Sequence, residues 1–302
     1  MMRSGSHGAP NASSPAALVR AATERLARAG VTAPRADAEQ LLAYVLDVPR
    51  GQLVLAARPD DEQRRRYEAL LARRADREPL QHLTGRVGFR TVELAVGPGV
   101  FVPRPETELL TGWAVDEANR VVAAGRARPV VVDLCAGSGA IAVAVAAGVG
   151  GAQVHAVELD PAAHAYAERN IHGTGVELRL GDAAVAFADL DGEVDVVVAN
   201  PPYIPLEAYE GVDLEVRRHD PPVALWSGED GLDAIRMVER VAARLLRPGG
   251  AVGCEHADVQ GRSAPAVFSG AERWAQVRDH CDLVDRPRFV TARRWHSADY
   301  GG

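Results

Sequence analysis

Lysine is absent from the sequence, so all 34 basic residues other than histidine are arginine. Cysteine is scarce. The three residues, Cys135, Cys254 and Cys281, are too few to suggest a disulfide framework. They also lack the spacing of metal ligands, so we expect no bound metal. This cysteine usage is typical of a reducing, cytoplasmic compartment. The N-terminus is rich in small residues and proline and has no apolar core, so we expect residues 1–14 to be disordered rather than a signal peptide.

No apolar run predicts a membrane span. The most apolar stretch, residues 130–151, contains Asp133 and several glycines, and it is better explained as a strand, a loop and a helix. We therefore expect no membrane partner.

Charge is distributed unevenly along the chain, whose net charge is −7. Residues 1–90 contain 15 arginines and 10 acidic residues, whereas the remainder contains 19 arginines and 31 acidic residues. An ordinary solvated surface explains this asymmetry, and so does an N-terminal unit that binds an acidic partner. The acidic remainder argues against a broad duplex-DNA surface, because such a surface must neutralise phosphates. We expect no direct nucleic-acid partner.

The hydrophobic pattern divides the chain into three regions after the N-terminus. Residues 15–79 have apolar residues at helical spacing and predict a small bundle of three or four helices. Residues 80–104 alternate and are punctuated by glycine, which predicts a β-hairpin linker. Residues 105–302 alternate between strands and helices and predict an α/β domain with a doubly wound, mostly parallel sheet. Its predicted strands are 129–134, 153–158, 176–180, 194–199, 250–256 and two within 274–294, and its predicted helices include 139–148, 161–171 and 230–246.

A glycine loop follows the first of these strands. Gly137 and Gly139 allow a tight turn and a close approach to a ligand, and the helix that follows offers free N–H groups. Asp133 ends the strand and is expected to point into the crevice at the edge of the sheet. Glu158 ends the next strand, where an acid can bind both hydroxyls of a ribose. The pattern fits a dinucleotide such as NAD, S-adenosylmethionine, or a glycine turn that binds no ligand. Asp133, together with Asp182 after the third strand, favours S-adenosylmethionine.

The stretch "ANPPYIP" follows the fourth strand, at residues 199–205. Prolines cannot extend a strand, so the chain leaves the sheet here and presents Asn200 and Tyr203 at its carboxyl end. An acceptor amide or amino nitrogen carries two N–H groups that need partners. The Asn200 side-chain oxygen can accept one and the Pro201 carbonyl the other, with Pro202 holding the turn rigid. Tyr203 can pack on a flat substrate or face a sulfonium, although a turn that merely caps the strand has the same residues.

At these residues the chain resembles the peptide-chain release factor glutamine N5-methyltransferases, which are class I S-adenosylmethionine-dependent enzymes. The similar stretches are "REPLQHLTGRVGF", "FVPRPETE", "DLCAGSGAIA", "AVELD", "GDA", "NPPYIP", "HDPPVALWSGEDGLD" and "LRPGGAVGCEHADVQ". The Asn-Pro-Pro-Tyr motif is shared with adenine-N6 and other amino methyltransferases, whereas "FVPRPETE" after a helical region is more specific. The resemblance implies a seven-stranded Rossmann-like methyltransferase sheet. Where the family usually has glycine this chain has Cys135, which a negative φ would tolerate.

The resemblance also implies roles for individual residues. Asn200, Pro201 and Tyr203 are expected to be catalytic, and together with Pro202 to bind the glutamine side chain. S-adenosylmethionine is expected to contact the segments around the glycine loop and the strand ends: Phe101, Arg104, Asp133, Cys135, Ala136, Gly137, Ser138, Gly139, Glu158, Asp182, Ala183 and Asn200. His219 is expected to have a structural role or to lie at the rim, because the chemistry does not demand a base.

The substrate implied by the resemblance is the glutamine of the Gly-Gly-Gln loop in class 1 release factors, bound by the N-terminal bundle of a monomeric enzyme. The alternatives are a glutamine methyltransferase of a ribosomal protein and an adenine-N6 nucleic-acid methyltransferase. An NAD-dependent oxidoreductase would leave residues 200–203 unexplained. A non-catalytic cofactor-binding module would not need Asn200 and Tyr203.

Overall fold

A computed structural model describes residues 14–295, so the predicted disorder of residues 1–14 lies, apart from Ser14, outside the described part. The chain forms two compact units that divide between Gly85 and Arg86. The first unit is helical, as the apolar spacing predicts. Its elements are α1 (Pro15–Arg28), α2 (Pro34–Leu46), η1 (Arg50–Leu55), α3 (Asp61–Ala75) and α4 (Leu80–Thr84).

Local signals explain where these helices begin. The Ser14 hydroxyl accepts the N–H of Ala17 at the start of α1, and Asp60 and Gln63 form a capping box at the start of α3. Leu41 and Leu42 of α2 are fully buried in the core of the bundle. Burial of one face of each helix supplies most of the stability that helices of this length lack alone.

The second unit begins with a hairpin and continues into the sheet. Strands β1 (Arg86–Phe89) and β2 (Val92–Ala95) pair antiparallel, and α5 (Thr107–Ala123) follows. The seven strands of the main sheet have the order β5-β4-β3-β6-β7-β9-β8, in which β9 is antiparallel to both neighbours. The predicted seven-stranded, mostly parallel sheet is confirmed. The strands are β3 (Val130–Asp133), β4 (Gln153–Glu158), β5 (Glu177–Leu180), β6 (Val194–Ala199), β7 (Leu246–Glu255), β8 (Trp274–Cys281) and β9 (Pro287–Arg294).

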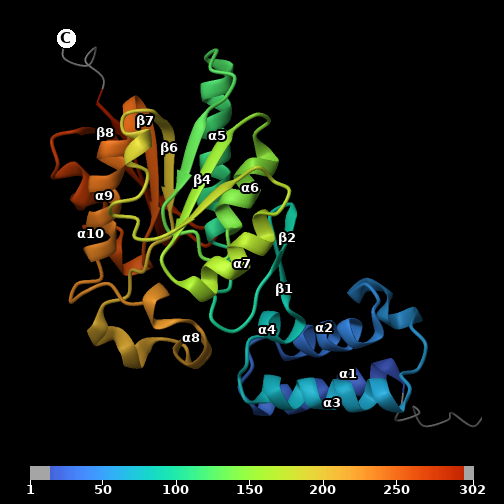
Figure 1. Cartoon of the computed structure of the whole chain (residues 1–302). Helices are drawn as coiled ribbons and strands as arrows, with labels where there is room; N and C mark the ends of the chain where they lie inside the picture. Colours follow the sequence, from blue (N-terminus) through green and yellow to red (C-terminus); the bar gives the residue numbers. More distant parts are fainter. Residues whose placement is uncertain (1–13, 296–302) are drawn as a thin grey trace, which may run out of the picture. The chain divides into compact units, whose positions relative to one another are not determined.

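Helices cover both faces of this sheet (Figure 1). Helices α5 and α6 (Ala140–Gly148) pack on one face, where Val131 and Val198 are buried, and α7 (Pro161–Ile171) follows β4. Helices α9 (Asp233–Leu245) and α10 (Ser263–Ser269) pack on the other face, where Val132 and Val197 are buried. The central strands are therefore apolar on both faces, as is usual for strands sandwiched between helices.

The segment after β6 differs from the predicted long loop. It contains η3 (Leu206–Gly211), α8 (Leu214–His219) and η4 (Pro222–Ala224). Two further short helices lie elsewhere: η2 (Ala188–Leu190) after β5 and η5 (Asp258–Gln260) after β7. Helices of three to six residues are too short for apolar periodicity to indicate. None of the helices of residues 14–295 is long and apolar enough to cross a membrane.

Candidate active site

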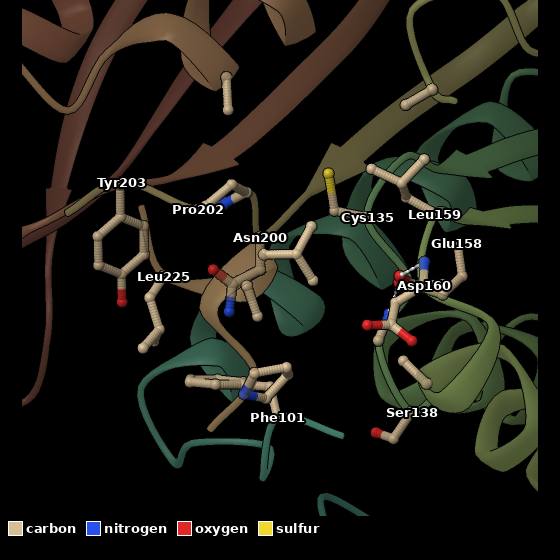
Figure 2. A pocket seen from close by; sticks show the side chains of 18 of the residues that line it. Phe101, Cys135, Ser138, Glu158, Leu159, Asp160, Asn200, Pro202, Tyr203 and Leu225 are labelled. Carbon is tan, nitrogen blue, oxygen red and sulfur yellow. Dashed lines mark hydrogen bonds between the residues drawn. The ribbon is translucent and has the colours of Figure 1, made fainter. Parts of the chain in front are cut away.

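A cavity of about 560 Å³ lies at the carboxyl ends of β3, β4, β5 and β6. In parallel α/β sheets this edge is where ligands bind. In Figure 2, Glu158 and Asp160 lie on one side of the cavity, and Tyr203 and Leu225 lie on the other. The structure brings together in its wall most of the predicted site residues: Phe101, Arg104, Cys135, Ala136, Gly137, Ser138, Glu158, Asp182, Ala183, Asn200, Pro202 and Tyr203.

The glycine loop turns as the sequence predicts. Gly137 and Gly139 have φ values of 56° and 81°, in the left-handed region that favours glycine. Cys135 has no such φ, so its side chain causes no strain, and burial raises the pKa of its thiol. The side-chain amide of Asn170 donates to the Ser138 carbonyl at 2.9 Å and exchanges two hydrogen bonds with the backbone of Ala95. Helix α7 thereby ties the loop to the hairpin.

Glu158 is held at the end of β4 by two backbone amides. Its Oε2 accepts the N–H of Gly137 at 2.7 Å, and its Oε1 accepts the N–H of Asp160 at 2.8 Å. Burial raises the pKa of this carboxyl, and the two amides oppose that shift. Each carboxylate oxygen can still accept a further hydrogen bond on the cavity side.

Three predicted site residues do not line the cavity: Asp133, Gly139 and Pro201. Asp133 does not point into the crevice, because β3 is covered on both faces and its side chain is completely buried. Burial raises its pKa to about 7, although the backbone N–H groups of Cys135 and Ala142 oppose the shift. Its carboxylate is therefore placed to support the backbone of the glycine loop, to which Cys135 belongs.

Asn200 is oriented by the first turn of α5. Its Nδ2 donates to Oγ1 of Thr107 at 3.2 Å, and Thr107 is itself buried. Neither Oδ1 of Asn200 nor the carbonyl of Pro201 accepts a hydrogen bond from residues 14–295. Two acceptors are therefore available at the point where the chain leaves β6.

Tyr203 is held at two of its atoms, the hydroxyl oxygen and the carbonyl oxygen. Its hydroxyl donates to Oε1 of Glu255 at 3.4 Å, and its carbonyl accepts from Nε2 of Gln260 at 3.1 Å. Gly231 passes so close that a Cβ there would lie 2.5 Å from the same carbonyl. Burial raises the pKa of the Tyr203 hydroxyl, so it stays protonated at neutral pH.

The segment 206–226 contributes an apolar part of the wall through Val212, Val216, Leu225 and Trp226. The rings of Tyr209 and Trp226 lie 5.5 Å apart, which joins η3 to the end of the segment. His219 does not line the cavity.

Three residues near the site escape sequence reasoning: Thr107, Asp220 and Glu255. Thr107 lines the cavity, Asp220 forms an ion pair with Arg104 at 2.6 Å, and Glu255 hydrogen-bonds Tyr203. All three lie in stretches that resemble the family, and Glu255 also ends a strand at the carboxyl edge as Glu158 does. Their individual roles depend on partners at long sequence separations, which no local pattern reveals.

Comparison with known proteins identifies both units. Residues 17–85 match the family described as the PrmC N-terminal domain, and residues 115–211 match the methyltransferase small domain. The catalytic domain of hMettl16, crystallised with an RNA hairpin, has a TM-score of 0.50 and 16% identity over 76% of this chain and 83% of that chain, and so shares the fold.

Relatives of similar length are much closer in sequence. A 4-amino-L-phenylalanine/4-methylamino-L-phenylalanine methyltransferase of Streptomyces pristinaespiralis is 44% identical over 91% of this chain and 94% of its own length. A release factor glutamine methyltransferase of Streptomyces coelicolor is 57% identical over 92% of this chain and 97% of its own length. The two domain matches and the 57% identity agree. The chain therefore belongs to the release factor glutamine methyltransferase family.

Proposed function

We propose that this protein methylates N5 of the glutamine in the Gly-Gly-Gln loop of class 1 translation release factors, with S-adenosylmethionine as the methyl donor. The observation that carries the proposal is the Asn200 side chain, held by Thr107 with its oxygen unpaired on the wall of the cavity. A rigid acceptor beside a nucleoside-sized cavity suits an amide substrate, whose two N–H groups need partners when they leave water.

The residues of the cavity fit S-adenosylmethionine better than a dinucleotide. Glu158, Asp160 and Asp182 line one part of it, and among the described residues Arg104 is the one basic side chain in the wall. This negative balance suits a sulfonium and disfavours a pyrophosphate. Glu158 would hold the ribose hydroxyls, and a Cβ at Gly137 would meet only open space, so the loop has room for a ligand.

When bound, S-adenosylmethionine would supply an electrophilic methyl group: the C–N bond to the amide would form as the C–S bond breaks, with S-adenosylhomocysteine as the leaving group. The N-methylated amide is strongly acidic and would then lose one proton to solvent water. The protein positions the nitrogen. Asn200 Oδ1 accepts one N–H, and the Pro201 carbonyl is proposed to accept the other. Alignment of this kind can contribute up to about 7–11 kcal/mol. Tyr203 and Phe101 line the cavity and exclude water, and no basic side chain is required.

The proposal also concerns the partner. We assign release-factor binding to the N-terminal helical region, residues 15–79. The stretch that contains this region, residues 1–90, has 15 arginines and 10 acidic residues. We propose that the enzyme acts as a monomer in the cytoplasm, where translation terminates, on a protein substrate and without direct contact to nucleic acid.

A second candidate is a free aromatic amine, because one relative is a 4-amino-L-phenylalanine methyltransferase. The apolar side chains of Phe101, Tyr203 and Trp226 in the wall are compatible with an aromatic ring. The uneven charge of the chain favours the protein substrate.

The test is methyl transfer from labelled S-adenosylmethionine to a purified class 1 release factor. The matched substrate has the glutamine of its Gly-Gly-Gln loop changed to alanine, and 4-amino-L-phenylalanine and a ribosomal fraction serve as competing acceptors. We expect label on the unmodified release factor alone. Equal labelling of both release factors would overturn the assigned acceptor, and label on the aromatic amine alone would favour the second candidate.

A further inference from the structure

Two buried polar residues, Thr107 and Glu255, contact Asn200 and Tyr203 respectively. The proposed reaction does not itself use either of them. Glu255 is 1% exposed at the end of β7, and Thr107 is 4% exposed in the first turn of α5. Oε1 of Glu255 accepts from the Tyr203 hydroxyl, and Oε2 has no hydrogen-bond partner of standard geometry among the described residues. A buried carboxylate with an unpartnered oxygen destabilises a protein, so its presence beside the site calls for a functional reason.

The Thr107 hydroxyl cannot by itself fix the direction of the Asn200 amide. A hydroxyl both donates and accepts, so it can accept from Nδ2 of Asn200 or donate to Oδ1 of the flipped amide. Only the first arrangement leaves Oδ1 free for a substrate N–H. The choice therefore depends on where the hydroxyl proton of Thr107 is directed.

The Glu255 carboxylate can serve as the acceptor for that proton. The Thr107 hydroxyl lies close enough to the carboxylate to lower its pKa by hydrogen bonding. An ionised carboxylate only accepts hydrogen bonds. If the hydroxyl points its proton at Glu255, its lone pairs face Asn200 and can receive only the Nδ2 donor.

We propose that Glu255 is a positioning residue which, through Thr107, holds the Asn200 amide with its oxygen toward the substrate and, through the Tyr203 hydroxyl, holds the ring beside it. The inference rests on the proposed amide methylation. It assigns the two residues that set which end of Asn200 faces the acceptor nitrogen.

Protonation of Glu255 should release this arrangement. Burial raises the pKa of Glu255 to about 7, and the nearby groups act in both directions: Thr107, Tyr203 and Arg288 lower it, whereas Glu106 raises it. A protonated Glu255 can donate to Thr107, which frees the hydroxyl to donate to Oδ1 of a flipped Asn200. Turnover should then fall as the pH drops below about 7.

The experiment compares Glu255→Gln and Thr107→Val with the unaltered enzyme in methyl transfer to the release factor. We expect kcat to fall at least tenfold in each variant, with KM for the release factor and the calorimetric Kd for S-adenosylmethionine changed less than threefold. With release factor and S-adenosylmethionine both saturating, the acid limb of the kcat profile near pH 7 should disappear in Glu255→Gln. Thr107→Ser retains the hydroxyl and should recover most of the turnover.

Two matched controls separate positioning from general damage. Thr111→Val removes a fully buried hydroxyl one turn further along α5, and Glu239→Gln neutralises a buried carboxylate of α9 that bonds Arg273 and Trp274. Both residues lie outside the cavity wall, and both variants should keep the acid limb. Turnover and an acid limb in Glu255→Gln equal to those of the unaltered enzyme would overturn the inference.

A readout without catalysis distinguishes this failure from that of the proposed function. In ¹⁵N-labelled protein the side-chain amide signals of Asn200 should shift as the pH crosses about 7, and this shift should be absent in Glu255→Gln. An enzyme that does not methylate the release factor but shows the shift would refute the proposed substrate assignment and support the positioning role. Asn200 signals that are identical in both proteins at every pH would refute the positioning role.

Discussion

Nη2 of Arg104 lies 2.6 Å from Oδ2 of Asp220, and this ion pair joins two segments that are 116 residues apart in the sequence. The guanidinium also lies 4.6 Å from the centroid of the Phe101 ring, so one side chain contacts both an aromatic and an acid at the cavity. Asp220 follows α8 directly. The pair therefore fastens the segment 206–226, which forms part of the wall, to the approach to α5.

Asp220→Asn should loosen this segment. The side chain of Asp220 is 2% exposed, so loss of the charge leaves Arg104 without a buried partner. We expect KM for the release factor and Kd for S-adenosylmethionine to rise about tenfold, with a smaller change in kcat. Hydrogen exchange of residues 206–226 should become faster. Glu207→Gln alters an exposed acid of η3 and is the control; exchange that rises equally in both variants would contradict the role of the pair.

Acid should reproduce this effect in the unaltered enzyme. Burial raises the pKa of Asp220 to about 6, and Arg104 opposes the shift. The carboxylate is ionised above that pH and becomes neutral below it, so the ion pair is present at pH 7.5 and largely lost at pH 5. Faster exchange of residues 206–226 at pH 5, corrected for intrinsic rates and absent in Asp220→Asn, is the expected result.

Asn200→Ala removes the proposed amide acceptor. Turnover should fall on the order of 10²-fold, because a misplaced nucleophile loses the alignment that favours attack. The Kd for S-adenosylmethionine should change little, since the donor is expected to be held mainly by the glycine loop and Glu158. Single-turnover methyl transfer measures the first quantity and calorimetry the second. Near-normal single-turnover rates would remove Asn200 from the reaction.

Glu158→Gln should weaken binding of S-adenosylmethionine. The loss of one charge-assisted hydrogen bond corresponds to about 1.5–3 kcal/mol, or about 10- to 100-fold in Kd. Glu158→Ala should weaken it further, because it also removes the acceptor of the Gly137 and Asp160 amides. Glu177→Gln alters an exposed acid on the neighbouring strand and is the control in calorimetry. Equal Kd values for all three proteins would exclude Glu158 from the binding site.

Sequence reasoning located the parts of the site that one strand end or one loop determines. The carboxyl ends of parallel strands meet at one edge, so Gly137, Glu158 and Asn200 could be placed together from their positions after three predicted strands. The same reasoning misplaced Asp133, because the rule gives the edge at which a strand ends but not the direction of the last side chain.

The remaining parts depend on contacts between distant segments. Thr107 meets Asn200 only because α5 packs beside β6, and Arg104 meets Asp220 only because the segment 206–226 folds back toward residues 101–107. The short helices of that segment carry too few residues for a hydrophobic period to emerge. Such contacts arise from tertiary packing, which local propensity does not encode.

Glu255→Gln should make the protein more stable in a pH-dependent manner. The pKa of Glu255 is about 7 in the folded state, above its ordinary value of 4.5, and burial is the main cause. The folded state therefore binds the proton more tightly than the unfolded state. Between these two values the stability of the unaltered protein declines as the pH rises, and above about pH 7 the whole penalty of the buried charge is present.

Glutamine at this position carries no charge and escapes that penalty. At pH 8 the variant should melt higher, by about 2–4 °C for each kcal/mol gained, whereas at pH 4.5 the gain should vanish. Thermal denaturation across this range measures the difference. A melting difference that is constant from pH 4.5 to 8 would show that Glu255 does not carry a buried charge. A gain that grows with pH, in a variant that also loses turnover, would show that the carboxylate is kept for the reaction at the expense of stability.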